Sequence, residues 1–139
     1  MLRRFYTLGL TLMVVAGWAA QPALAETPSL VLASIQGEAK TAPGFQGFLA
    51  ARGESFFKTT HGNELSCASC HTENPGAQGK HAKTGKAIQP LAPSVNAERF
   101  SDPAKVEKWF KRNCNDVLGR LCTAQEKGDV LTYLLAVPK

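Results

Sequence analysis

The chain has 139 residues, of which 44% are hydrophobic and 19% are charged, and its formal net charge is +5. The basic excess is mild, and no basic run or basic–aromatic alternation accompanies it, which argues against nucleic-acid binding. The sequence contains no internal repeat or low-complexity segment, so it indicates one small domain.

The first 25 residues have the three parts of a secretory signal peptide. Arg3 and Arg4 give a positive start, an apolar stretch follows, and Ala23-Leu24-Ala25 is a small-x-small cleavage site. The apolar stretch is shorter than the roughly 20 residues that a membrane span needs. We therefore expect cleavage after Ala25, export to the periplasm and a single mature domain over residues 26–139. Its net charge is +3, because the signal peptide carries two of the 16 basic and none of the 11 acidic residues.

The periodicity of the mature chain is helical throughout. It predicts helices over residues 29–40 and 45–59, exposed loops over 58–66 and 72–89, and a stiff extended segment at 90–93. Ser101 or Asp102 is the expected N-cap of a third helix, with Pro103 in its first turn. Thr123 and Glu126 form a capping box that opens the last helix. No strong strand signal appears, so we predict an all-α fold with about four to five helices.

The central motif is Cys67-Ala68-Ser69-Cys70-His71, a C-x-x-C-H sequence typical of covalent c-type haem attachment. Two thiols one helical turn apart match the two vinyl groups on one side of the porphyrin. The adjacent His71 then lies below the ring, where its imidazole binds iron as the proximal ligand. We predict one covalent haem c.

Two alternatives compete with this interpretation. A redox-active C-x-x-C would need a βαβ context, which the sequence lacks. A zinc site would need a second pair of ligands, and the spacing of Cys114 and Cys122 is unlike that of a zinc knuckle.

The order of helix, haem motif, long loop, proline segment, helix and C-terminal helix resembles the class I cytochrome c fold. In that fold the helix before the motif crosses the last helix, with a glycine that permits close approach and aromatic residues beside it. Gly53, Phe57 and Tyr133 match those roles, although ordinary core residues would show the same pattern.

The second axial ligand of the iron is the open question. Class I cytochromes usually take it from a methionine, but Met1 and Met13 are the only methionines and both leave with the signal peptide. One alternative is His61 or His81, although the simpler interpretation is that both are ordinary exposed histidines. The others are a deprotonated lysine among Lys80, Lys83 and Lys111, or five-coordinate iron.

The missing methionine would belong to the loop that we expect after Trp109, where the sequence reads KRNCNDVLGRLC. Cys114 is either a thiolate ligand or the partner of Cys122 in a disulfide, which would contribute about 2–3 kcal/mol on the entropic model. The amide oxygen of Asn113 or Asn115 is a neutral, hard acceptor that suits ferric iron better than ferrous iron.

The blocks TGKAIQPLAPS, RFSDPAKVEKWFKRNC and GRLCTAQEKGDVL resemble the sphaeroides haem protein (SHP) family. The resemblance covers residues 84 to about 135 together with CASCH, and is loose over residues 26–66. It implies that Asn113, immediately before the first bridge cysteine, is the axial ligand. It also implies a Cys114–Cys122 disulfide, although Asn115 fits the family pattern as well.

The resemblance implies an exported electron carrier whose Asn113 leaves the iron on reduction, so that oxygen or nitric oxide binds. It also implies a redox partner, in this family a dihaem cytochrome c, which Lys80, Lys83 and Lys86 are expected to steer unless they only solvate their loop. A simple electron shuttle and an oxygen- or nitric oxide-reducing enzyme are the alternatives. The enzyme is disfavoured because only Asp116 offers a proton donor near the expected ligand.

Two further residues complete the predicted site. The Pro90 carbonyl is expected to accept a hydrogen bond from the outer nitrogen of His71 and so to fix the ring orientation. Trp109 is expected to be a core residue, a haem contact or both.

Overall fold

The computed structural model describes residues 27–139, and the predicted signal peptide lies outside them. Within this range the chain forms five helices and one small sheet, which confirms the all-α prediction. The helices and strands are α1 (Pro28–Ala39), α2 (Ala50–Lys58), α3 (Ala68–His71), β1 (Gly79–Lys80), β2 (Ala87–Ile88), α4 (Pro103–Leu118) and α5 (Ala124–Ala136). No helix within residues 27–139 is long and apolar enough to cross a membrane.

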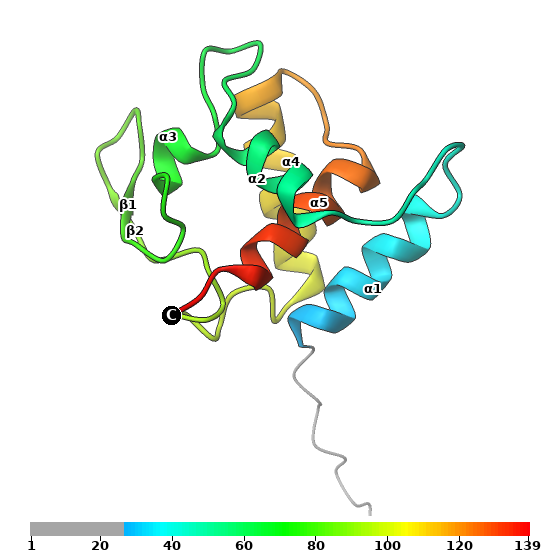
Figure 1. Ribbon diagram of the computed structural model, residues 1–139. Helices are drawn as coiled ribbons and strands as arrows, with labels where there is room; N and C mark the ends of the chain where they lie inside the picture. The colour runs from blue at the N-terminus through cyan, green and yellow to red at the C-terminus, as the bar shows by residue number, and fades with distance from the viewer. Residues whose placement is uncertain (1–26) are drawn as a thin grey trace, which may run out of the picture.

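The centre of the molecule is a close crossing of α2 and α5 (Figure 1). A Cβ atom at Gly53 would overlap the backbone carbonyl of Asp129, so only glycine permits this approach. The ring centroids of Phe57 and Tyr133 lie 5.6 Å apart beside the crossing. The roles predicted for these three residues are therefore confirmed.

The N-terminus of α2 is fixed by a side chain from α5. Asp129 is buried, and its Oδ1 accepts hydrogen bonds from the backbone N–H of Leu49 at 2.7 Å and from Arg52 Nη2 at 2.8 Å. This contact caps the first turn of α2 from a residue 80 positions away. The helix predicted over residues 45–59 thus begins only at Ala50, because Gly47 takes a left-handed conformation and Asp129 holds the turn that follows.

Apolar packing joins the crossing to α1 and α4. One cluster of buried residues contains Val31 and Ile35 of α1, Val106 of α4 and Leu131 of α5. Lys127 is buried in the same region and donates hydrogen bonds to Glu38 of α1 and Glu107 of α4. α5 is consequently held to both neighbouring helices.

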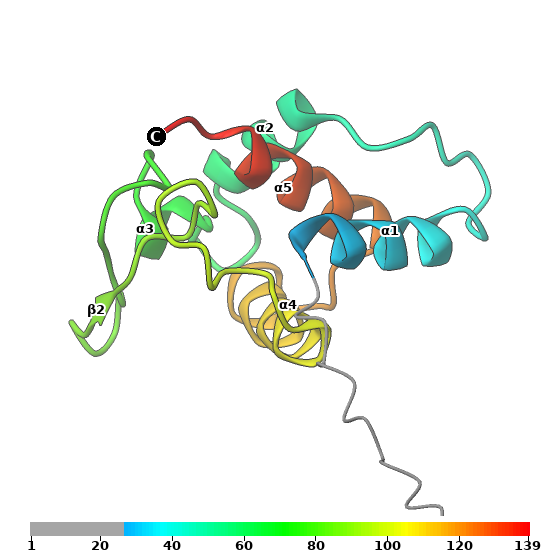
Figure 2. The same ribbon diagram turned by 90° about the horizontal axis from the view of Figure 1, so that it is seen from below.

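The fourth helix is longer than the sequence suggested. Asp102 caps its N-terminus by accepting a hydrogen bond from the Lys105 N–H at 3.0 Å, as predicted. The prediction of a loop after Trp109 is wrong, because the helix continues for more than two further turns. It ends at Gly119, whose left-handed conformation (φ 71°) provides the C-cap. Figure 2 shows α3 on one side of the molecule, α1 on the other, and α4 and α5 between them.

Candidate functional site

The C-x-x-C-H motif forms one short helical turn, α3. The hydroxyl of Ser66 accepts a hydrogen bond from the Ser69 N–H, and the hydroxyl of Ser69 accepts one from the Ser66 N–H. This reciprocal pair fixes the entry into the turn. Cys67 and Cys70 carry free thiols, and burial raises the pKa of Cys67 to about 11. Neither sulfur is part of a disulfide, so both are available for covalent attachment.

His71 ends the turn and is half-buried, with Phe57 as an aromatic neighbour. Its ring centroid lies 6.4 Å from that of Phe57. Burial, with a smaller contribution from the positive charge of Arg99, lowers the pKa of His71 to about 4. The imidazole is therefore neutral at pH 7, which is the form that binds a metal ion.

Arg99 is a site residue that the sequence reasoning missed. Its Nε donates a hydrogen bond to the Pro90 carbonyl at 2.9 Å, and its Nη2 donates to the Gln89 carbonyl at 2.7 Å. Burial lowers the pKa of the guanidinium. Arg99 lay within a family-like block, but a single arginine before a phenylalanine gave no signal of its own.

Pro90 lies in the extended segment that Arg99 holds. Its carbonyl accepts hydrogen bonds from Arg99 and, at 3.3 Å, from Asn96 Nδ2. The proposed bond from His71 to this carbonyl stays a prediction.

Asn113 lies on α4, immediately before the buried Cys114. Cys114 forms a disulfide with Cys122, and the Cα atoms of the pair are 5.5 Å apart. The bond ties the last turns of α4 to the segment that enters α5, and it removes Cys114 as a candidate thiolate ligand. It also removes both cysteines from any zinc site.

The two asparagines of this stretch differ in their surroundings. Asn113 is half-buried, on the side of α4 that adjoins the buried Val106, Cys114 and Val117. Asn115 is exposed and lines an outer surface groove with Lys108, Lys111, Arg112 and Leu121. The helix thus separates two residues that sequence alone left equivalent.

Trp109 precedes Asn113 by one helical turn. Its side chain is 49% exposed, and the guanidinium carbon of Arg112 lies 5.5 Å from the ring centroid. The prediction of a core position is therefore wrong, because α4 buries the adjacent face that contains Val106. Its proposed contact with haem remains a prediction.

The alternative ligands occupy ordinary structural positions. His61 Nε2 lies 3.0 Å from the Phe56 carbonyl at the end of α2. His81 Nδ1 accepts hydrogen bonds from the N–H groups of Lys83 and Thr84 in the turn between β1 and β2. Lys80, Lys83 and Lys111 are exposed. Both histidines therefore organise the loops that contain them.

The strand β1 lies directly against the motif. A Cβ atom at Gly79 would overlap the backbone carbonyl of Cys70, and the Ala82 N–H lies 3.4 Å from Cys70 Sγ. The predicted loop over residues 72–89 thus contains a short antiparallel pair, in which Gly79 faces Ile88. This pair supports α3 from the side of Cys70.

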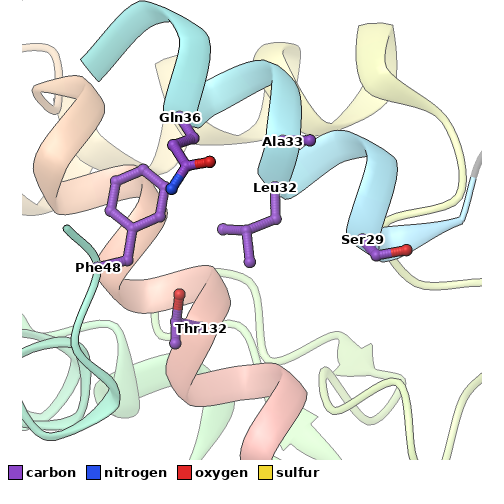
Figure 3. A pocket seen from close by; sticks show the side chains of 6 residues that line it. All are labelled: Ser29, Leu32, Ala33, Gln36, Phe48 and Thr132. Atoms are coloured by element: carbon purple, nitrogen blue, oxygen red, sulfur yellow. The ribbon is translucent and has the colours of Figure 1, made fainter. Parts of the chain in front are cut away.

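A groove between α1 and α5 is lined by Ser29, Leu32, Ala33, Gln36, Phe48 and Thr132 (Figure 3). None of these residues belongs to the motif or to the end of α4. The groove also lacks a titratable side chain, so it is not the candidate site.

The residues around α3 fit a covalently attached haem. They supply two free thiols one turn apart, a neutral imidazole next in the chain, and apolar side chains beside the motif. The buried cluster next to Cys67 contains Phe57, Ala68, Val130 and Leu134, flanked by Leu91, Phe100 and Phe110. Within residues 27–139, no three His, Cys, Asp or Glu side chains are grouped so as to hold a metal ion.

Comparisons with known proteins agree with this site. The family described as a domain of unknown function, DUF1924, matches residues 43–134. The chain is 46% identical over 91 residues to the cytochrome c-type protein SHP of Cereibacter sphaeroides, covering 63% of this chain and 70% of SHP. It is 53% identical over 83 residues to cytochrome c'' of Methylophilus methylotrophus. That match covers 60% of this chain and spans only 58% of the length of cytochrome c''.

Two solved structures have the same fold. One is oxidized SHP, described as an oxygen-binding cytochrome c, with a TM-score of 0.70 and 41% identity over 80% of this chain and 97% of SHP. The other is the solution structure of Methylophilus methylotrophus cytochrome c'', a study of haem-ligand detachment. It has a TM-score of 0.69 and 38% identity over 81% of this chain and 94% of that chain. The predicted cytochrome c fold is thus confirmed, and both relatives are named as cytochromes rather than enzymes. The chain belongs to the DUF1924 family and is a c-type cytochrome homologous to SHP and cytochrome c''.

Proposed function

We propose that the protein is an exported electron carrier with one covalent haem, in which Asn113 is a weak second axial ligand that leaves on reduction. When bound, haem c supplies an iron centre that cycles between the ferric and ferrous states. Cys67 and Cys70 hold it through thioethers, and His71 binds the iron from the proximal side. Departure of Asn113 opens a position for a small diatomic molecule such as oxygen or nitric oxide.

The different positions of the two asparagines carry this proposal. Asn113 adjoins the buried side of α4, whereas Asn115 lines an outer groove with charged residues. An amide oxygen is a neutral, hard donor, which favours ferric over ferrous iron. SHP is described as an oxygen-binding cytochrome c, and the cytochrome c'' structure is described as giving insight into haem-ligand detachment. Both descriptions support ligand release and diatomic binding in the present protein.

The Cys114–Cys122 disulfide restricts unwinding of the end of α4 that carries Asn113. Because Asn113 directly precedes Cys114, rotation of its side chain can open the site without unwinding the helix that the bridge constrains. The release that we propose therefore does not require α4 to unwind.

Substitution of Asn113 tests the ligand assignment. In Asn113→Ala, the ferric absorption spectrum of the holoprotein should change from the low-spin to the high-spin form, because the iron loses a ligand. The control is Asn115→Ala, which removes the neighbouring amide and should leave the spectrum unchanged. An unchanged ferric spectrum in Asn113→Ala would reject Asn113 as the ligand.

We also propose a partner and a compartment. The exposed Lys80, Lys83 and Lys86 lie on the β1–β2 hairpin, which contacts Cys70 through Ala82, so they are suited to steer an acidic redox protein such as a dihaem cytochrome c. Charge reversal at Lys83 and Lys86 should slow oxidation of the reduced protein by the anion ferricyanide at low salt, and equal rates would eliminate this role.

Export to the periplasm predicts a mature protein that starts at Glu26, which mass spectrometry of a periplasmic extract checks.

A further inference from the structure

The C-terminal end of α4 is capped by a residue from a distant loop. Asn63 Nδ2 donates hydrogen bonds to the backbone carbonyls of Asp116 at 3.0 Å and Asn115 at 3.4 Å. The Asn63 N–H donates to the carbonyl of Val117 at 3.4 Å. The last carbonyls of a helix have no partner within the helix, and here one asparagine contacts three in a row.

The loop that carries Asn63 is itself well fixed. The His61 N–H donates to the Leu65 carbonyl, the Glu64 N–H donates to the His61 carbonyl, and Glu64 has a left-handed backbone conformation (φ 58°). The His61 ring also contacts Phe56 of α2, with centroids 4.6 Å apart. The turn is therefore a closed unit attached to the central crossing.

This loop connects the two sides of the candidate site. Asn63 precedes Cys67 by four residues, and it caps carbonyls that follow Asn113 by two to four residues. Any movement of α4 away from the attachment motif must lengthen or break these hydrogen bonds. The Cys114–Cys122 disulfide ties the same end of α4 to the segment that enters α5 and makes no link to the motif.

We infer that Asn63 is a positioning residue that holds the end of α4 against the haem-attachment segment and so sets how readily Asn113 leaves the iron. The inference rests on the proposed role of Asn113. Asn63 touches neither His71 nor the reacting atoms, and it acts through the position of the helix.

Two substitutions of Asn63 separate this role from general stability. Asn63→Ala removes the donor. Asn63→Asp keeps the shape but places a carboxylate, which cannot donate, against the carbonyl oxygens of Asn115 and Asp116 at the negative end of the helix dipole. We expect the high-spin fraction of the ferric holoprotein to rise about fivefold in both variants. The net contribution of one hydrogen bond changes an equilibrium constant, here that between bound and released Asn113, by a factor of about this size.

The aspartate variant adds a pH signature. On acidification its carboxyl gains a proton and again donates one hydrogen bond, so the low-spin form should recover as the pH falls through the carboxyl titration. Wild type and Asn63→Ala lack this carboxyl and should show no such recovery.

The matched control is Asn115→Asp. It adds the same charge to the same helix end but keeps the backbone carbonyl that Asn63 binds, so its ferric spectrum should resemble that of wild type. Amide hydrogen exchange supplies an independent measurement. The Gly119 N–H, which donates to the Asn115 carbonyl at 3.0 Å, should exchange faster in Asn63→Ala than in Asn115→Asp.

The outcomes distinguish the inference from the proposed function. If Asn113→Ala becomes high-spin while both Asn63 variants keep the wild-type spectrum, Asn63 has no positioning role and Asn113 remains the ligand. An equal spectral change in Asn115→Asp would also overturn the inference, because charge alone would explain it. If Asn113→Ala itself keeps the wild-type spectrum, the proposed function and the inference fall together.

Discussion

The α2–α5 crossing and the end of α4 are stabilised by different kinds of contact. At the crossing, Gly53 lies against the backbone of α5, and residue Asp129 is only 4% exposed. At the end of α4, the Asn63 hydrogen bonds are exposed to water, and the nearby Leu121 is 60% exposed. Hydrogen bonds in contact with solvent open at much lower cost than close-packed contacts. The ligand-bearing helix end can therefore shift while the crossing stays intact.

The largest expected effect is at the crossing. Gly53→Ala should destabilise the holoprotein by about 3 kcal/mol, because the new Cβ overlaps the Asp129 carbonyl and pushes α2 away from α5. Denaturant unfolding measures this. Gly37→Ala is the matched control, since a Cβ at Gly37 in α1 meets nothing within 4 Å and alanine is the better helix former. A Gly53→Ala protein as stable as the Gly37→Ala protein would refute the close approach.

The disulfide is the strongest constraint on the end of α4. The double variant Cys114→Ala with Cys122→Ala should lose about 2–3 kcal/mol of unfolding free energy, because a nine-residue loop is no longer closed in the unfolded chain. Its ferric high-spin fraction should also rise, which Gly53→Ala should not cause at temperatures where it is folded. A double variant with the wild-type ferric spectrum would show that the bridge does not restrain Asn113.

The smallest effect concerns the capping box at the start of α5. Burial raises the pKa of Glu126, but its hydrogen bonds with Arg120 and Thr123 outweigh burial and hold the pKa below its usual value of 4.5. Stabilisation by Glu126 is thus complete above about pH 4.5 and is lost as the pH falls through the folded-state pKa.

Glu126→Gln tests this dependence. The difference in unfolding free energy between wild type and Glu126→Gln should be constant above pH 5 and shrink below pH 4.5. Chemical unfolding at several pH values measures it. A difference that stays the same down to pH 3 would contradict the assigned pKa shift.

Local sequence signals predicted the helix ends that depend on local contacts. α1 and α5 lie within a residue of their expected starts, and the caps at Asp102 and Thr123 form as their sequences indicate. The reason is physical: a capping side chain bonds to backbone only two or three residues away.

The errors arose where distant residues decide the structure. The start of α2 depends on Asp129, and the C-terminal end of α4 is capped by Asn63, which no window of neighbouring residues reveals. The β1–β2 pair was missed because strands of two residues show no alternation. The motif Cys67–His71 could be predicted from the sequence because its chemistry needs adjacent residues. Arg99 could not be predicted, because it is distant from His71 in the sequence and only the fold brings its charge near the imidazole.

Carbon monoxide binding to the reduced holoprotein tests the central claim most directly. If Asn113 leaves on reduction, the ferrous absorption spectrum should be high-spin, and carbon monoxide should convert it to a low-spin form without a slow ligand-displacement step. A low-spin ferrous spectrum that carbon monoxide does not change would contradict the account.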